Sequence, residues 1–319
     1  MKNEWVTRNC DRGDAPTGVR SQWSGRTHSF FNRLSMTPEN YCRKICKKSG
    51  SNFVYSFYLL PKKRREGLEA FYAFCRLIDD VVDQQKGVAE ARGELTAWRE
   101  ELDRIYHGNP LHLVGKALAP IVLHFKIPKE YFQEIINGCE MDLTQGEYSS
   151  FEDLDRYLYR VASCVGLISI YLFEVPVDER NKEMAIAMGK ALQMTNIVRD
   201  VVEDLSRGRV YLPQEDLKQF GVEIADLRGN EAKKMMLLDL LYFELDRAKQ
   251  FFKTSWKLFP KNREERKKMI AAKAMGCIYE RLHEKISRNP REIFKKKVRI
   301  SFGEKLKVFT LILLKEYLA

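Results

Sequence analysis

The sequence lacks any long apolar run. The longest late candidate, VFTLILL at residues 308–314, has only seven residues, whereas a membrane-spanning helix needs about 20. The first segment, MKNEWVTRNCDRGDAPTGVR, contains no apolar stretch of the kind found in a secretory signal. We therefore expect a chain with neither a signal peptide nor a membrane span.

Cysteine is too sparse and too scattered for a disulfide framework. The chain has 7 cysteines, an odd number, among 319 residues of which 45% are hydrophobic, so it can bury a core without disulfides. Cys42 and Cys46 lie at helical spacing, but no second pair of Cys or His residues lies nearby, which disfavours a zinc site. This cysteine usage indicates a reducing cytoplasm.

Two nucleotide-binding motifs are also absent. The chain contains neither a GxxxxGK phosphate loop nor a GxGxxG dinucleotide motif. The sequence therefore does not support a nucleoside triphosphatase or a Rossmann-type reductase.

Strand patterns are missing, and helical patterns fill the chain instead. From about residue 37 onward, apolar residues recur at helical spacing. Clusters of Pro, Gly and other turn-forming residues interrupt them at 108–110, 127–129, 146–150, 174–179, 206–209 and 220–223. We expect an all-α fold, a single bundle of about ten or more helices over 36–319. Residues 1–35 show no such period and are expected to be disordered, and Thr37 is expected to cap a helix that begins at Pro38.

An expected helix over about 67–86 carries polar side chains on one face of an otherwise apolar segment. Tyr72, Arg76, Asp79 or Asp80, and Asp83 follow one another at steps of three or four residues. Aspartates this close together repel each other by roughly 0.2–0.5 kcal/mol per pair at a helix surface, and by more when buried. Some other group must balance their charge.

A second expected helix, over about 179–205, repeats this pattern. Gln193, Asn196, Asp200 and Asp204 share one face, with Arg199 alongside, and most of the flanking residues are Met, Leu, Ile or Val. A solvated acidic face, or ion pairs with neighbouring arginines, would explain either stripe alone. The presence of two stripes, their amides and their apolar surroundings favour a binding site.

The residue types in these stripes favour magnesium and phosphate chemistry. Carboxylates and amides offer the hard oxygen ligands that suit Mg²⁺, which commonly binds one or two carboxylates and bridges to substrate phosphates. Four cations near the stripes suit phosphate oxygens: Lys48, Arg76, Arg199 and Arg209. The aromatic stretch at 51–61 fits core packing and an apolar substrate channel equally well. Together these features indicate ionisation of an allylic diphosphate.

The net charge of +11 favours a different class, a helical protein that binds nucleic acid or anionic membrane. That function would not explain carboxylate stripes within apolar helices, and we expect no nucleic-acid partner. The basic and partly apolar segment FKKKVRISFGEKLKVFTLILL, residues 294–314, nevertheless suits peripheral contact with anionic lipid.

Five ordered segments resemble the motifs of the squalene/phytoene synthase family over about residues 37–310. They are SGSNFVYSFYLLP, FYAFCRLIDDVVD, YLYRVASCVG, ALQMTNIVRDVVEDLSRGRVYLP and IYERLHEKI. Within the family, the segments SGSNF and FKKKVRI are most similar to those of the presqualene diphosphate synthases of bacterial hopanoid pathways. The resemblance implies an isoprenoid-synthase-type helical bundle around a central cavity. It also implies two aspartate-rich motifs that face each other and bind Mg²⁺ and diphosphates.

The resemblance carries over to single residues, position by position. It implies metal binding by Asp79, Asp80, Asp83, Asn196, Asp200 and Asp204. It implies a part in catalysis for Tyr72, Arg76, Asp79, Asp83, Tyr157, Asp200 and Asp204. It implies substrate binding by Ser51, Phe53, Val161, Val165, Gln193, Asn196, Arg199, Arg209, Tyr211 and Tyr279, with Val161 and Val165 in the cavity wall.

The implied reaction is a Mg²⁺-dependent, head-to-head condensation of two farnesyl diphosphates to presqualene diphosphate, with release of diphosphate. Squalene, dehydrosqualene and phytoene synthases of the same family remain alternatives, because the side chains at the cavity floor that would select substrate length cannot be located from the sequence. The base is either a tyrosine or the released diphosphate. We expect a cytoplasmic enzyme with peripheral membrane contact through its basic C-terminal segment, working beside downstream isoprenoid enzymes.

Overall fold

The computed structural model describes residues 36–84 and 87–318, and in these ranges the regular elements are all helices. A single isolated bridge pairs Glu147 with Val210 there. The α-helices are α3 (Pro38–Ser49), α4 (Asn52–Phe57), α5 (Lys62–Asp83), α6 (Val88–Tyr106), α7 (Leu113–Phe125), α8 (Lys129–Thr144), α9 (Phe151–Leu158), α10 (Cys164–Leu172), α11 (Glu179–Ser206), α12 (Gln214–Gln219), α13 (Lys234–Leu258), α14 (Arg263–Lys268), α15 (Ile270–Arg288) and α16 (Phe302–Leu313). Short segments are η1 (Tyr159–Ser163) and η5 (Leu314–Leu318), which are π-helical, and η2 (Ile224–Arg228), η3 (Glu231–Lys233) and η4 (Pro290–Phe294), which are 3₁₀-helical. The predicted all-α class is confirmed, whereas the extension predicted at 1–35 lies outside the described residues.

Helix ends follow the turn-forming residues of the sequence. Each of the predicted interruptions lies at or between helix ends. Thr37 caps α3 as predicted, since its side chain accepts a hydrogen bond from the backbone NH of Asn40 at 3.3 Å. The helix expected over 179–205 is α11, and the one expected over 67–86 is α5, which begins earlier, directly after Pro61.

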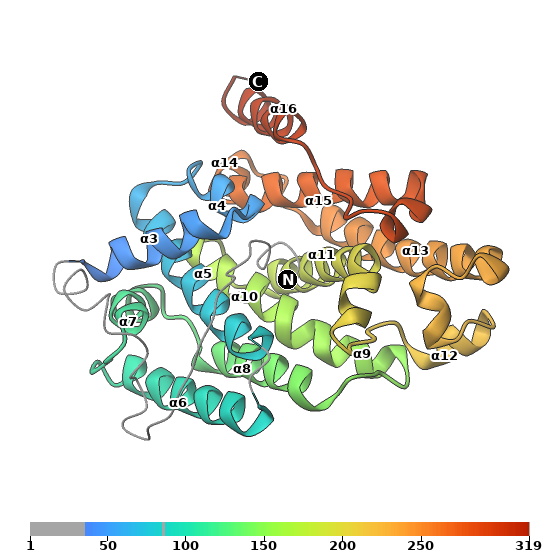
Figure 1. Cartoon of the computed structure of the whole chain (residues 1–319). Helices are drawn as coiled ribbons and strands as arrows, with labels where there is room; N and C mark the ends of the chain where they lie inside the picture. Colours follow the sequence, from blue (N-terminus) through green and yellow to red (C-terminus); the bar gives the residue numbers. More distant parts are fainter. Residues whose placement is uncertain (1–35, 85–86, 319) are drawn as a thin grey trace.

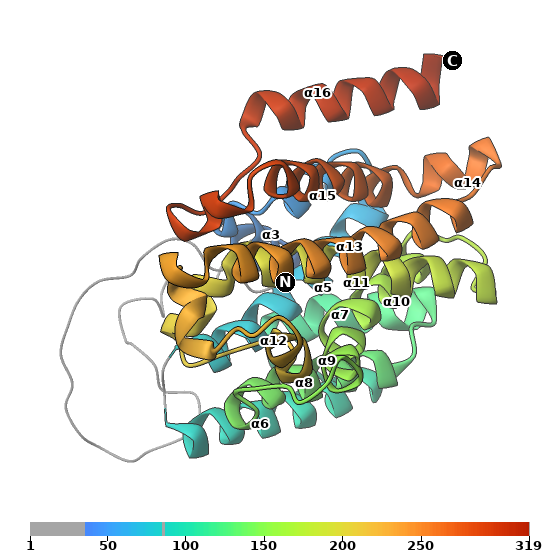
Figure 2. The same ribbon diagram turned by 90° about the vertical axis from the view of Figure 1, so that its right-hand side faces the viewer.

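The helices stack in layers. Figure 1 shows α11 near the centre of the molecule, and the helices α10, α13 and α15 all pack against it. In Figure 2 the layers run from α16 at the top, through α15 and α13, to α6 at the bottom. Helix α16 packs on α15 and forms the outermost layer on that side.

Two glycines allow α11 to approach η1 and α10 closely. A Cβ atom on Gly189 would lie 2.5 Å from the carbonyl oxygen of Ala162, and one on Gly166 would lie 2.5 Å from the carbonyl oxygen of Ala185. Any larger residue would therefore push the helices apart. Both glycines border the central cavity, so this close crossing shapes one of its walls.

A cavity lies inside the bundle, and about 1000 Å³ of empty space lies within its outline, part of it open to solvent. Side chains from α5, α10, α11 and α15 form most of its wall, with contributions from α4 and from the C-terminal part of α13. Its lining is largely apolar, and the expected central cavity is present. None of the helices in the described ranges combines the length and the apolar character needed to cross a bilayer.

Candidate active site

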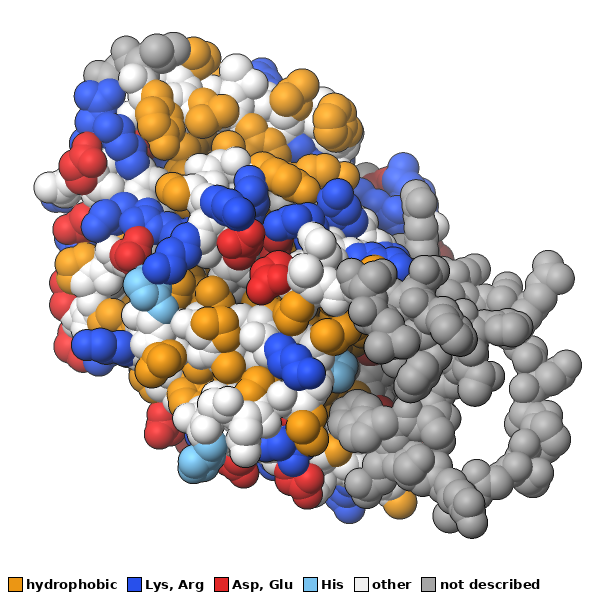
Figure 3. All heavy atoms as spheres, turned by 90° about the vertical axis from the view of Figure 1, so that its left-hand side faces the viewer, with side chains coloured by type: hydrophobic (Ala, Val, Ile, Leu, Met, Phe, Trp, Pro, Cys, Tyr) orange, Lys and Arg blue, Asp and Glu red, His pale blue; other side chains and the backbone are white. Residues whose placement is uncertain are grey.

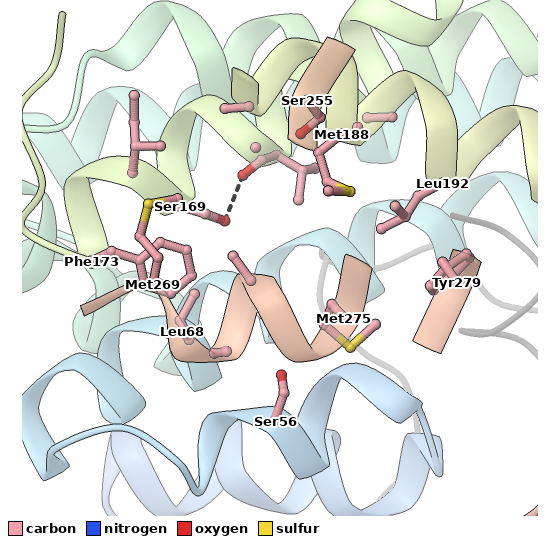
Figure 4. A pocket seen from close by; sticks show the side chains of 18 of the residues that line it. Ser56, Leu68, Ser169, Phe173, Met188, Leu192, Ser255, Met269, Met275 and Tyr279 are labelled. Carbon is pink, nitrogen blue, oxygen red and sulfur yellow. Dashed lines mark hydrogen bonds between the residues drawn. The ribbon is translucent and has the colours of Figure 1, made fainter. Parts of the chain in front are cut away.

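The cavity has two chemically different ends. Its lining follows α5 over 68–75 and α11 over 184–196, so it runs lengthwise between these helices. Figure 4 shows Phe173 and Met269 on one side of the cavity and Tyr279 on the other. We call the end bordered by Phe173 and Met269 the apolar end.

The acidic residues of α5 lie one helical turn beyond the cavity lining. Asp79 follows the lining residue Cys75 by four positions and so shares its face. It is 3% exposed, and its Oδ1 accepts a hydrogen bond from the thiol of Cys139 at 3.3 Å. Asp80 is paired with Arg76, with 2.9 Å between Oδ1 and Nη2. Burial raises the pKa of Asp80, although Arg76 acts in the opposite direction.

Helix α11 repeats this arrangement. Asn196 lines the cavity, and Asp200 and Asp204 follow at steps of four residues with 2% and 3% exposure. Arg209, which follows α11, connects the two helices, because its Nη1 lies 2.9 Å from Oδ1 of Asp83 at the end of α5. The two aspartate-rich stretches therefore converge. We call this region the acidic end of the cavity, formed by Asp79, Asp80, Asp83, Asp200 and Asp204.

Asp200 is paired with two cations. Its Oδ2 accepts hydrogen bonds from Nε and Nη2 of Arg199 at 2.9 and 2.6 Å, and Arg199 is itself buried. Lys297 places its Nζ 3.1 Å from Oδ1 of Asp200 and 2.8 Å from Oε2 of Glu203. Arg199 was expected beside the acids, whereas Lys297 was expected only within the basic segment at 294–314. Nothing in FKKKVR indicates that this segment folds back onto α11.

The donor atoms at the acidic end fit Mg²⁺. The buried oxygens Oε1 of Gln193 and Oδ1 of Asn196 accept no hydrogen bond from the residues that the structure describes. Together with the carboxylates, these are the hard oxygen ligands that Mg²⁺ prefers. Within 36–84 and 87–318, no group of three His, Cys, Asp or Glu side chains forms a ready-made metal cluster. A site with one or two carboxylates per ion, completed by phosphate and water, needs no such cluster.

Tyr157 and Tyr211 share a buried carboxylate. The hydroxyl of Tyr157 donates to Oδ2 of Asp142 at 3.3 Å, and that of Tyr211 donates to Oδ1 at 2.7 Å. Their rings stack with centroids 5.2 Å apart. Burial, reinforced by the charge of Asp142, raises the pKa of both phenols, so both stay protonated near neutral pH. Asp142 was not predicted as a site residue, because it belongs to neither acidic stripe.

The other predicted substrate residues meet the cavity in different ways. Five predicted site residues line the cavity directly, namely Tyr72, Val165, Gln193, Asn196 and Tyr279. Ser51 is buried, and burial raises the pKa of Tyr72, although Ser49 and Ser51 act in the opposite direction. Phe53 belongs to α4, but its side chain lies outside the part that the structure describes.

Val161 does not line the cavity, although Val165 does. A Cβ atom on Gly138 would lie 2.6 Å from Cγ1 of Val161, so Val161 faces α8. Both valines were expected in the cavity wall. The π-helical segment η1 (Tyr159–Ser163) inserts a wider turn, and the lining position passes to Ala162.

Comparisons with known protein sequences agree with this geometry. A family model described as squalene/phytoene synthase matches residues 46–304. The 15-cis-phytoene synthase of Synechococcus elongatus is 32% identical over 276 residues, which cover 83% of this chain and 89% of that protein. The phytoene synthase of Arthrospira platensis is 35% identical over 223 residues, which cover 66% of this chain and 72% of that protein.

Solved structures show the same fold. A dehydrosqualene synthase in complex with a ligand superposes with a TM-score of 0.77 at 30% identity, covering 88% of this chain and 96% of that one. The squalene synthase HpnC from Alicyclobacillus acidocaldarius gives a TM-score of 0.69 at 29% identity, covering 79% of this chain and 93% of that one. The isoprenoid-synthase-type bundle is thus confirmed, and the chain belongs to the squalene/phytoene synthase family of prenyltransferases.

Proposed function

We propose that the protein condenses two molecules of farnesyl diphosphate head to head, giving presqualene diphosphate and free diphosphate. The observation that supports this best is an apolar cavity inside the bundle that ends at two converging aspartate-rich helices. The cavity suits large apolar chains, and the acidic end suits their diphosphates.

The acidic end would hold Mg²⁺ through Asp79, Asp80, Asp83, Asn196, Asp200 and Asp204. When bound, Mg²⁺ would neutralise the diphosphate and stabilise it as a leaving group. Arg76, Arg209 and Lys297 already pair with carboxylates here. These cations can turn to phosphate oxygens as metal takes over the carboxylates. The repulsion between the aspartates is thereby balanced both before and after substrate binds.

The condensation follows from an allylic cation held in a dry cavity. The bond between C1 and the diphosphate oxygen of the donor breaks, and the cation is attacked by the 2,3 double bond of the acceptor. A new bond between C1 of the donor and C2 of the acceptor leaves the positive charge on C3 of the acceptor. Loss of a proton from the donor C1 then forms the bond between C1 and C3 that closes the cyclopropane. Apolar side chains such as Leu192 and Met275 exclude the water that would otherwise trap the cation as an alcohol.

The released diphosphate is the better candidate for the base. The phenol of Tyr157 stays protonated because burial raises its pKa, and its proton is already donated to Asp142. A protonated phenol cannot accept the proton from C1. Tyr157 and Tyr211 then act by holding the helices around the acidic end in position.

A second candidate is the corresponding reaction with geranylgeranyl diphosphate, which leads to phytoene. It is favoured by the relatives at 32% and 35% identity, both of which are named phytoene synthases. The structures at 29% and 30% identity are instead named squalene and dehydrosqualene synthases. Both candidates use the same acidic end and differ in the length of chain that the apolar end must accept.

The deciding experiment incubates the purified protein and Mg²⁺ with farnesyl diphosphate or geranylgeranyl diphosphate, with and without NADPH. We expect presqualene diphosphate from the farnesyl substrate without NADPH, identified by mass spectrometry after dephosphorylation. Phytoene as the main product would contradict the farnesyl assignment. If neither substrate reacted and circular dichroism showed a folded protein, the condensation itself would be refuted.

A further inference from the structure

Helix α16, with η5 after it, places two acids on its inward face although much of its outward face is apolar. Its inward face is formed by Glu304, Val308, Ile312 and Glu316, each one turn after the last. Val308 and Ile312 are buried at 3% and 6% exposure, and Glu316 is fully buried at 0%. A surface helix usually keeps its acids in water and its apolar residues inside. Here an acid is turned inward.

Ion pairs hold both ends of α16 on the bundle. At its start, Oε2 of Glu304 lies 3.4 Å from Nζ of Lys285 on α15. Beyond its end, Oε2 of Glu316 lies 2.9 Å from Nε of Arg266 on α14, and Oε1 of Glu316 pairs with Lys273 on α15. These contacts fix the rotation of the helix about its axis. The opposite face of the helix therefore points away from the bundle.

The outward face is strongly apolar. Phe302 is 70% exposed, Leu306 54%, Leu311 50% and Tyr317 50%. Leu313 and Leu314 add to the same surface, which we call the outer face of α16. Figure 3 shows hydrophobic side chains gathered over this helix at the top of the view, with Lys and Arg side chains below them. A contiguous apolar surface of this kind marks an interaction site.

The charges around the outer face are positive. Lys307 and Lys315 are exposed on α16 and η5, and Lys295, Lys296 and Arg299 are exposed on the segment that leads into α16. The acids of α16 and η5 are Glu304 and Glu316, and both are engaged by cations. An apolar face with a basic border fits an anionic lipid surface, where basic residues meet headgroups and apolar side chains enter the acyl boundary. Two such faces from two copies of the chain would bring like charges together.

We propose that the outer face of α16 binds the protein to an anionic membrane surface, with the helix lying flat in the interface. Its 12 residues span about 18 Å, well short of the ~30 Å hydrocarbon core, so the helix lies on the bilayer and does not cross it. Helix α15 packs against α16 and also lines the cavity through Met275 and Tyr279. The cavity therefore lies one helix away from the bound lipid.

Vesicle sedimentation tests this proposal with the full-length protein and no substrate, so its result is independent of the proposed reaction. We expect binding to phosphatidylcholine vesicles that contain phosphatidylglycerol, and much weaker binding to phosphatidylcholine alone or at high salt. The triple variant Phe302→Ser, Leu306→Ser, Leu313→Ser should lose about tenfold or more in partition. Lys307→Gln and Lys315→Gln should each lose about fivefold.

Matched variants control for general surface effects. Leu111→Ser with Leu123→Ser removes leucines that are 68% and 80% exposed elsewhere, and Lys116→Gln with Lys218→Gln removes exposed lysines elsewhere. Both pairs should bind vesicles like the unmodified protein. Absence of vesicle binding, or unchanged binding of the triple variant, would overturn the proposal. So would a dimer in light scattering that the triple variant dissociates, because a second copy would then cover this face.

Discussion

The acidic end of the cavity is built on α5 and α11, whereas the apolar end is bordered by residues at the end of α10 and the start of α15, and the two ends have opposite chemistry. At the acidic end, Asp83 and Asp200 are each held by a basic side chain from a distant part of the chain. At the apolar end, the lining around Phe173 and Met269 contains no charged side chain. The first end suits bond breaking at a diphosphate, and the second suits selection of prenyl length. Relatives named for different products are consistent with this division.

Removing a carboxylate at the acidic end tests this division most strongly. We expect Asp79→Asn or Asp200→Asn to lower kcat by about a thousandfold, because each removes a charge that would hold the metal and its diphosphate. The assay is product formation from farnesyl diphosphate at saturating Mg²⁺. Circular dichroism should show an unchanged helical content.

A buried acid elsewhere provides the control. Glu244 on α13 is 0% exposed and paired with Arg247 at 2.7 Å, and it does not line the cavity. Glu244→Gln should keep kcat within about twofold, since it lies outside the site. Full activity of the Asp79 or Asp200 variant would refute the role of the acidic end. Equal losses in all three variants would point to a general loss of folding.

Neutralising Asp142 should have the next largest effect. Asp142→Asn leaves one acceptor oxygen where two tyrosine hydroxyls now donate, so either Tyr157 or Tyr211 loses its acceptor and its fixed position beside the acidic end. We expect kcat to fall by about ten- to hundredfold, with the substrate KM changed far less. Tyr148→Phe is the matched control, because Tyr148 stacks on Tyr211 without a hydrogen bond to Asp142. If that variant lost as much activity, removal of any buried hydroxyl from this tyrosine cluster, and not loss of the shared carboxylate, would explain the effect.

The sequence predicted the parts of the site that lie on one helix. Asp79 and Asp83, or Asn196 and Asp200, are separated by single turns, so helical periodicity alone places them on one face. Lys297 and Asp142 were missed because their partners are distant in the chain, and only tertiary packing brings them together. Val161 was assigned to the cavity wall, but the π-helical turn shifts the register there. Periodicity assumes a regular helix, and it fails at such a turn.

Enlarging the apolar end should change substrate choice more than rate. Phe173 is buried at the end of α10 and borders the cavity. Phe173→Leu removes ring volume there, and we expect the ratio of geranylgeranyl to farnesyl diphosphate use to rise by about tenfold, the lower end of the range for a small change of volume in an apolar pocket. Competition between the two substrates, read by mass spectrometry, measures this ratio. Phe252→Leu, a buried change away from the cavity, should leave the ratio unchanged; an equal shift there would mean that the apolar end does not select chain length.

The smallest expected effect concerns Glu244, a buried acid that lies away from the acidic end. Glu244 and Asp216 share the guanidinium of Arg247, and burial raises the pKa of Glu244 to about 8. The folded protein therefore binds a proton that the unfolded chain releases near pH 4.5. Stability from this group is present at low pH and is lost as pH rises toward about 8.

Thermal melts should show Tm falling by a few degrees across this window. Glu244→Gln, which cannot release a proton, should flatten the slope of Tm against pH while turnover persists. An unchanged slope would show that Glu244 is ionised throughout, with Arg247 outweighing its burial.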